Sequence, residues 1–185
     1  MIKTNKSIFF IMALFLFGCA FYGHSQRSKS ALSLSGGYVP DGYAVKLGYN
    51  HYHNRTDFIK IALIGAIGNQ SLSTGLEIPF NDFIVDGGYF ASLVKSPTSG
   101  ISLAVGGGLS LGYENVNNGE SVLDDGSILL SESGFIYGLF VGSDFDFFIS
   151  EKISLIIPID FHYHFNSDLG NSLFVAGLGV RYYFN

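Results

Sequence analysis

The sequence has one cysteine, no tryptophan and few charged residues. The scarcity of cysteine and of basic residues excludes several kinds of chemistry and binding. Cys19 is the only cysteine and lies in a segment expected to be removed, so the mature chain has no disulfide and no thiol nucleophile. Acidic residues number 15 against 10 Lys and Arg, a net charge of −5, and no basic cluster occurs. An acidic chain of this kind is not expected to bind nucleic acid directly.

Long apolar runs are missing as well, apart from one near the start. Residues 8–17 are all apolar and follow Lys3 and Lys6. That length is typical of a signal-peptide core and too short for a membrane-spanning helix. We predict a signal peptide over residues 1–25 and a single domain over residues 26–185, whose net charge becomes −7 without the two lysines. Cleavage directly before the single cysteine, which would leave it to be lipidated, is the alternative.

Glycine and aromatic residues are abundant, and apolar residues alternate with small or polar ones. In residues 101–114 the odd positions are mostly large and apolar, whereas the even positions are small or polar. A period of two predicts β-strands, and no 3.6-residue apolar period follows the signal. The eight predicted strands are residues 31–38, 43–51, 58–68, 83–94, 101–114, 135–147, 153–165 and 174–184.

The connections between these strands alternate in length. Long loops such as 69–82 and 115–134 fall at one end, and short turns such as 150–152 fall at the other. This alternation is typical of outer-membrane barrels, in which the long loops face outward. A face of small and polar residues is a poor exterior in water but suits a crowded interior. We therefore predict an all-β fold, an eight-stranded antiparallel up-and-down transmembrane (outer-membrane) β-barrel after a cleaved signal peptide.

Polar side chains on the inward face of such a barrel would meet in its lumen. The estimated strand registers place both Asp144 and Arg181 diagonal to Asp160, and Gly177 opposite His162. Arginine suits a pair of buried carboxylates because its planar fork can bind both. The predicted lumen polar cluster consists of Asp144, Asp160, His162, His164 and Arg181.

The strand that carries the histidines has two further features. Pro158 has no N–H, so we expect one missing ladder bond there, without a shift of register. His162 and His164 could bind a metal with Asp160 as a third ligand, but we favour polar filling of the lumen. We expect His51, which begins a second pair of histidines at this spacing, to lie on the surface at the rim. No metal, cofactor or catalytic residue is predicted.

Enzymatic motifs are missing too. The sequence has no Gly-x-Ser-x-Gly elbow, so we predict no enzyme, although a barrel that modifies lipid remains an alternative. Residues 105–112 are rich in glycine but lack the lysine of a phosphate-binding loop and a following helix. Those glycines instead indicate a strand packed closely against neighbouring side chains.

The longest connection, residues 116–134, combines acidic and apolar residues. Its oxygen-bearing side chains do not match the spacing of an EF-hand calcium loop. Exposed apolar residues in a long loop favour a docking surface or a cap over the barrel mouth. The candidate partner-binding residues are Glu120, Asp124, Asp125, Ile128, Leu129 and Leu130.

Two stretches carry a family resemblance. They are NVNNGESVLDDGSILLSESGFIYG at 115–138 and LEIPFNDFIVDGGYF at 76–90. Both resemble segments of the TraO family of conjugative-transposon transfer proteins, and the likeness extends over residues 26–185. It implies a component of the DNA-transfer machinery at the cell envelope, with no catalytic or ligand residues to transfer.

We accordingly expect an accessory or structural protein of the outer membrane. Its expected partners are other envelope components of a conjugation apparatus and the outer-membrane lipid. The alternatives are a lipid-modifying barrel enzyme and a general adhesion or envelope-stability barrel.

Overall fold

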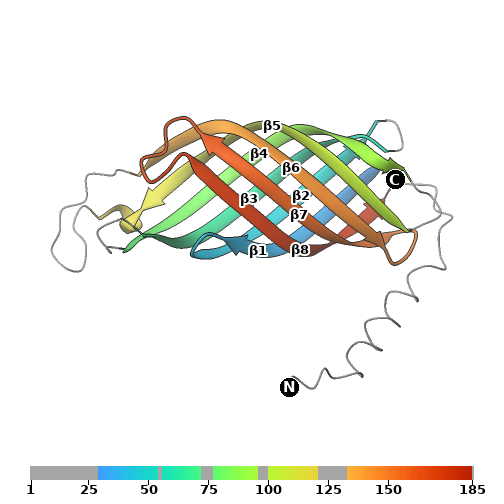
Figure 1. Cartoon of the computed structure of the whole chain (residues 1–185), viewed down its shortest axis with the longest axis horizontal. Coiled ribbons are helices and arrows are strands. Elements are labelled where there is room, and N and C mark those ends of the chain that lie inside the picture. Colours follow the sequence, from blue (N-terminus) through green and yellow to red (C-terminus); the bar gives the residue numbers. More distant parts are fainter. Residues whose placement is uncertain (1–28, 54–55, 72–76, 96–99, 121–132, 185) are drawn as a thin grey trace, which may run out of the picture.

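The computed structural model describes residues 29–53, 56–71, 77–95, 100–120 and 133–184. The predicted signal peptide lies outside these residues. Eight antiparallel strands form a closed barrel in which each strand pairs with the next and β8 returns to β1 (Figure 1). The strands are β1 (Ser30–Val39), β2 (Gly42–Tyr52), β3 (Phe58–Ser71), β4 (Glu77–Lys95), β5 (Ile101–Val116), β6 (Gly134–Phe148), β7 (Ile153–His164) and β8 (Ser172–Phe184). A short 3-10 turn, η2 (Asn117–Gly119), follows β5.

The predicted fold class is confirmed, including every strand and the order of pairing. Ser30 lies opposite Phe184, so both ends of the barrel chain meet at one end, here called the terminal end. The opposite end, called the loop end, carries the β1–β2, β3–β4, β5–β6 and β7–β8 connections. No helix among the described residues is long and apolar enough to cross a membrane.

The predicted long connection 69–82 is wrong in its bounds. Residues 69–71 pair with residues 77–79, so β3 and β4 extend well into the sequence expected to be loop. The polar residues and Pro79 of this stretch suggested a turn, because alternation of apolar residues was the signal for strand. Strand beyond the apolar band need not alternate in that way, and the hydrogen-bonded ladder continues without it.

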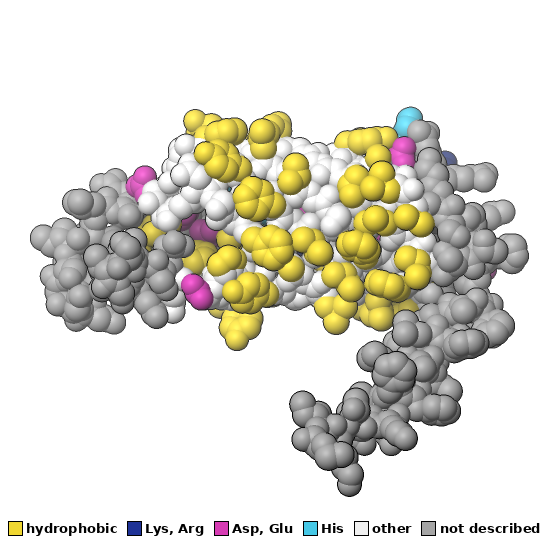
Figure 2. Space-filling model, in the orientation of Figure 1, with side chains coloured by type: hydrophobic (Ala, Val, Ile, Leu, Met, Phe, Trp, Pro, Cys, Tyr) yellow, Lys and Arg dark blue, Asp and Glu magenta, His cyan; other side chains and the backbone are white. Residues whose placement is uncertain are grey.

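The barrel is apolar outside and polar inside, the inverse of a water-soluble barrel. Leu109 exposes 65% of its surface, whereas its neighbour Ser110 is fully buried. The same contrast repeats along β2, β6 and β7, and apolar side chains stud the outer wall of the barrel in Figure 2. The chain has no tryptophan, and Tyr and Phe side chains such as Tyr43, Phe135 and Tyr182 take exposed positions on the outer wall. Such a wall suits hydrocarbon rather than water.

Inward-facing glycines make room for aromatic rings in the lumen. A Cβ on Gly88 would lie 2.8 Å from Cζ of Phe140 and 2.5 Å from the backbone oxygen of Gly107. The Phe140 ring in turn lies 6.2 Å from the ring of Phe90. The inward-facing Gly88 is therefore part of the packing of the barrel interior, as a closely packed strand requires.

Pro158 is accommodated as expected. Opposite β8, the pairs Ile156–Gly179 and Ile159–Ala176 lie in one unbroken register, and no pair forms between them at Pro158. The pairing of β7 with β6 is also continuous past this residue. The prediction of a local gap without a register shift is confirmed.

Candidate functional site: a charged lumen and its acidic mouth

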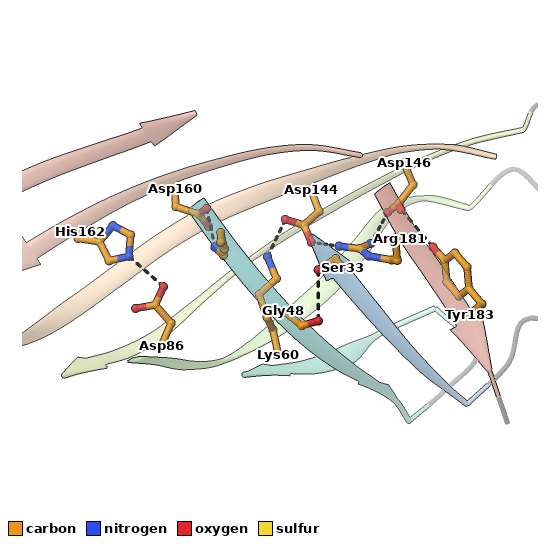
Figure 3. Close-up of polar contacts among 11 residues, drawn as sticks. Ser33, Gly48, Lys60, Asp86, Asp144, Asp146, Asp160, His162, Arg181 and Tyr183 are labelled. Carbon is orange, nitrogen blue, oxygen red and sulfur yellow. Dashed lines mark hydrogen bonds and ion pairs between the residues drawn. The ribbon is translucent and has the colours of Figure 1, made fainter. Parts of the chain in front are cut away.

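The lumen contains a row of charged side chains that runs along the barrel axis (Figure 3). Among the described residues, five ion pairs connect six strands, and every participating side chain is at least nine-tenths buried. From the loop end toward the terminal end the pairs are His162 with Asp86, Lys46 with Asp160, Lys60 with Asp144, and Arg181 with Asp144 and Asp146.

Arg181 on β8 holds two carboxylates of β6 with its planar fork. Its Nη2 donates to Oδ2 of Asp144 at 2.5 Å, and its Nη1 donates to Oδ2 of Asp146 at 2.6 Å. The other oxygen of Asp146 accepts hydrogen bonds from Ser154 Oγ at 2.8 Å and Tyr183 Oη at 3.1 Å. Asp144 and Asp146 point the same way because they are two residues apart on one strand.

The lysines come from the opposite wall. Lys60 Nζ on β3 donates to Oδ1 of Asp144 at 2.6 Å and lies 4.0 Å from the centre of the Phe90 ring. Lys46 Nζ on β2 donates to Oδ2 of Asp160 at 2.7 Å. In the terminal half of the lumen, three cations therefore face three carboxylates, and aromatic rings fill the space beside them.

The five residues of the predicted lumen cluster all lie inside the barrel, but not as a single group. Asp144 contacts Arg181, whereas Asp160 is paired by Lys46. The expected diagonal between Arg181 and Asp160 is wrong, because Arg181 lies opposite Ser154. His162 likewise lies opposite Leu173 instead of Gly177.

The physical reason is the length of the β7–β8 connection. The estimated register differs from the observed one by four residues, and an even slip keeps every side chain on its face while changing its neighbours. The residues that were missed are Lys46, Lys60, Asp86 and Asp146. A signal for them was present, since each is a charged residue at an inward position of an alternating strand.

The histidines do not converge with other ligands. In the described part of the chain, no group of three His, Cys, Asp or Glu side chains is arranged to hold a metal ion. His162 directs Nε2 to Oδ2 of Asp86 at 2.9 Å, and its ring lies 5.7 Å from that of Phe140. The ring of His164 lies 6.0 Å from the ring of His162, nearer the loop end. His51 and His53 lie exposed at the terminal end.

The loop end of the lumen is acidic. Asp82 on β4 lies directly opposite Glu114 on β5, and both are buried. Glu114 accepts hydrogen bonds from Ser167 Oγ at 2.8 Å and from the backbone N–H of Asp168 at 3.3 Å.

Of the candidate partner-binding residues, Glu120 is exposed just after η2. The others, Asp124, Asp125, Ile128, Leu129 and Leu130, lie outside the described residues.

The apolar exterior, the closed sheet and the filled polar lumen together define a small β-barrel of the transmembrane type. Solved structures of outer-membrane proteins share this fold. Neisserial surface protein A matches with a TM-score of 0.59 at 15% identity, covering 84% of this chain and 95% of that one. The attachment invasion locus protein Ail of Yersinia pestis matches with a TM-score of 0.57 at 15% identity, covering 86% and 100%. OprG from Pseudomonas aeruginosa matches with a TM-score of 0.59 at 6% identity, covering 87% and 98%.

At these identities the likeness concerns the fold alone. The family is identified from the sequence, because the conjugative transposon protein TraO family matches residues 30–184, which is the whole barrel. The chain belongs to the conjugative transposon protein TraO family, as the resemblance of its middle segments implied. No curated protein matches the chain in sequence.

Proposed function

We propose that this protein is a structural component of a conjugative-transposon DNA transfer apparatus, inserted in the outer membrane and acting through contacts with other envelope proteins. The observation that carries the proposal is the match of the conjugative transposon family to the entire barrel. Every strand that forms the barrel lies within the matched residues, so the family's defining unit is the barrel itself.

The outer wall supports insertion in a membrane. Large apolar side chains such as Leu34, Val141 and Leu178 expose about half of their surface or more, and burying them in hydrocarbon is favourable. Export would be directed by the predicted signal peptide. The even number of strands would place the terminal end in the periplasm and the loop end outside.

The lumen supports a structural role over conduction. Its charges are paired across the barrel, and Phe58, Phe90 and Phe140 occupy the space beside them. An eight-stranded barrel is just wide enough for side chains to fill, so neither DNA nor a folded protein can pass through it. The barrel therefore contributes surfaces to the apparatus, and the transfer channel is formed by other components.

An enzyme acting on lipid is the less favoured alternative. His162 pairs with Asp86 across the barrel, and Ser154 donates its hydroxyl to Asp146. In the described residues we find no serine hydrogen-bonded to a histidine as an acyl-transfer nucleophile requires.

The test is deletion of the gene in a donor strain, with complementation by the wild-type gene. Mating frequency should fall steeply in the deletion strain, growth should be normal, and complementation should restore transfer. Lipid A from the same strains should be unchanged. Undiminished mating would contradict the transfer role, and altered lipid A together with undiminished mating would support the enzyme.

A further inference from the structure

The charges outside the lumen are divided between the two ends of the barrel. After residue 28, the Lys and Arg residues outside the lumen are Lys29, Arg55, Lys95 and Lys152, and all belong to the terminal end or its connections. The connections of the loop end contain no Lys or Arg in their sequence. Their described acidic residues include Asp41, Glu120 and Asp168. The loop end therefore has a field of one sign, which attracts cationic partners and repels nucleic acid.

Two carboxylates at the mouth of the lumen have no compensating cation among the described residues. Asp82 and Glu114 lie directly opposite each other on neighbouring strands, each with only 5% of its surface exposed. No Lys or Arg in the described ranges pairs with either of them, and Oδ1 of Asp82 has no hydrogen-bond partner. Like charges directly opposite on a sheet are destabilising, and burial increases the cost.

Further unpartnered acceptors lie deeper in the same half of the lumen. Ser110 is fully buried, and its Oγ has no partner. It lies opposite Asp86, whose Oδ1 also has none. Buried polar groups in proteins are nearly always hydrogen-bonded, to the chain, to ordered water or to a ligand, so these atoms are open hydrogen-bonding positions in this half of the lumen. At the loop end, Figure 2 shows an acidic side chain recessed in a hollow of the surface.

The apolar surroundings specify what kind of cation fits. Ile84 lies two residues from Asp82 on the same face, and Ile136 lies opposite Gly112, two residues from Glu114. These isoleucines belong to an apolar collar that surrounds the lumen near the loop end. The collar consists of Val39, Ala44, Ile64, Ala66, Ile84, Ile136, Leu173 and Val175. The collar closes the lumen on the deeper side of the two acids, and the buried pair Phe80 and Val116 lies on their loop side. A lysine or arginine side chain has an apolar stem that suits this pair and a charged tip with several donors for the carboxylates.

We propose that the acidic mouth of the barrel binds a lysine- or arginine-rich segment of a partner protein, with one basic side chain inserted from the loop end, past Phe80 and Val116, toward Asp82 and Glu114. This inference rests on the proposed function, since it names the chemistry of the partner in the apparatus. A bare metal ion fits less well, because the described carboxylates and histidines do not converge as ligands. The basic residues of the barrel itself are paired in the lumen or lie at the terminal end.

The experiment uses the full mature chain folded in zwitterionic detergent micelles and a dye-labelled penta-lysine peptide as probe. Binding is followed by fluorescence anisotropy at low and at moderate salt. The variants are Asp82→Asn and Glu114→Gln, with Glu120→Gln as the matched control, because Glu120 is an exposed carboxylate at the same end. Each variant's fold is checked by its heat-dependent gel shift.

Asp82→Asn should weaken binding roughly tenfold, since it removes a desolvated charge contact, and Glu120→Gln should weaken it less than about threefold. Equal effects of Asp82→Asn and Glu120→Gln would mean that only surface charge attracts the peptide, which overturns insertion. Mg²⁺ alone is tested in parallel. An Asp82-dependent rise in thermal stability with Mg²⁺, without peptide binding, would replace the proposal by a cation site. If deletion of the gene abolishes mating while the variants bind peptide like wild type, this inference fails and the transfer role stands.

Discussion

Asp144 binds two cations at once, Lys60 through Oδ1 and Arg181 through Oδ2. The two cations come from β3 and β8, and the carboxylate comes from β6, so one side chain connects three walls of the barrel. Buried ion pairs contribute little net stability when they form, but removal of one partner leaves an uncompensated charge. The lumen network should therefore be sensitive to single substitutions and tolerant of matched ones.

Arg181→Leu should lower the free energy of unfolding by roughly 3–5 kcal/mol, the usual result of breaking a buried pair. Asp146 would lose its cation altogether, whereas Asp144 would retain Lys60. The measurement is urea-induced unfolding in lipid vesicles, followed by Tyr fluorescence. Lys152→Leu is the control, since Lys152 is exposed at the terminal end and should change stability little. An unfolding midpoint equal to that of wild type would contradict the assigned role of Arg181.

A double substitution tests whether Lys46 and Asp160 act as a pair. Lys46→Met alone should cost about 3–5 kcal/mol, because it leaves Asp160 buried without its cation. Adding Asp160→Leu should recover most of that loss, since two apolar side chains of similar volume replace the charges. The coupling free energy follows from the four proteins of the cycle. Additive losses would show that the contact is not energetically coupled.

The sequence predicted which side chains point into the barrel far better than it predicted which residues those side chains contact. Alternation alone placed Ser110, Asp160 and Arg181 inside, because a period of two assigns a side without needing a neighbour. The contact between Lys46 and Asp160 joins residues 114 positions apart, and it depends on barrel closure and on every intervening register. The β7–β8 register, four residues from its estimate, shows that turn length is the weak step.

The mouth of the lumen was missed for a related reason. Asp82 was assigned to a loop, because its polar neighbours broke the alternation that marks a strand. Its pairing with Glu114 follows only from the extended β4–β5 ladder. The acids of the β5–β6 connection were predicted as a candidate surface from the sequence alone, whereas the juxtaposition of Asp82 and Glu114 depends on the observed register of β4 and β5.

Asp82→Asn should stabilise the barrel by about 1 kcal/mol, because it removes one of two like charges directly opposite each other. Asp146→Asn is the matched control, and there the same change should destabilise, since Asp146 pairs with Arg181. Urea unfolding of both variants in the same vesicles measures whether each substitution raises or lowers the free energy of unfolding. Loss of stability in Asp82→Asn would indicate that this carboxylate is satisfied within the barrel, contrary to the proposed mouth.

Gly88 and Gly87 are neighbours on β4 that face opposite sides. A Cβ on Gly88 would lie 2.8 Å from the Phe140 ring, whereas a Cβ on Gly87 would have no atom within 4 Å. Gly88→Ala should therefore cost about 1–3 kcal/mol by overpacking, and Gly87→Ala should be neutral or stabilising by up to about 1 kcal/mol. Unfolding of the two variants side by side tests the assignment of inside and outside. Equal costs would contradict it.

Val141 tests whether the outer wall faces hydrocarbon. It lies midway along β6 and exposes 60% of its surface, so Val141→Arg would be almost harmless in a barrel surrounded by water. In a membrane the arginine would sit near the bilayer centre, where it costs about 2–4 kcal/mol. Asn115→Arg is the control, because Asn115 lies on β5 beside the loop end, where the cost falls to about 0–1 kcal/mol. Both variants are unfolded by urea from vesicles. A loss confined to Val141→Arg supports the membrane-spanning orientation, and equal stability of the two variants would contradict it.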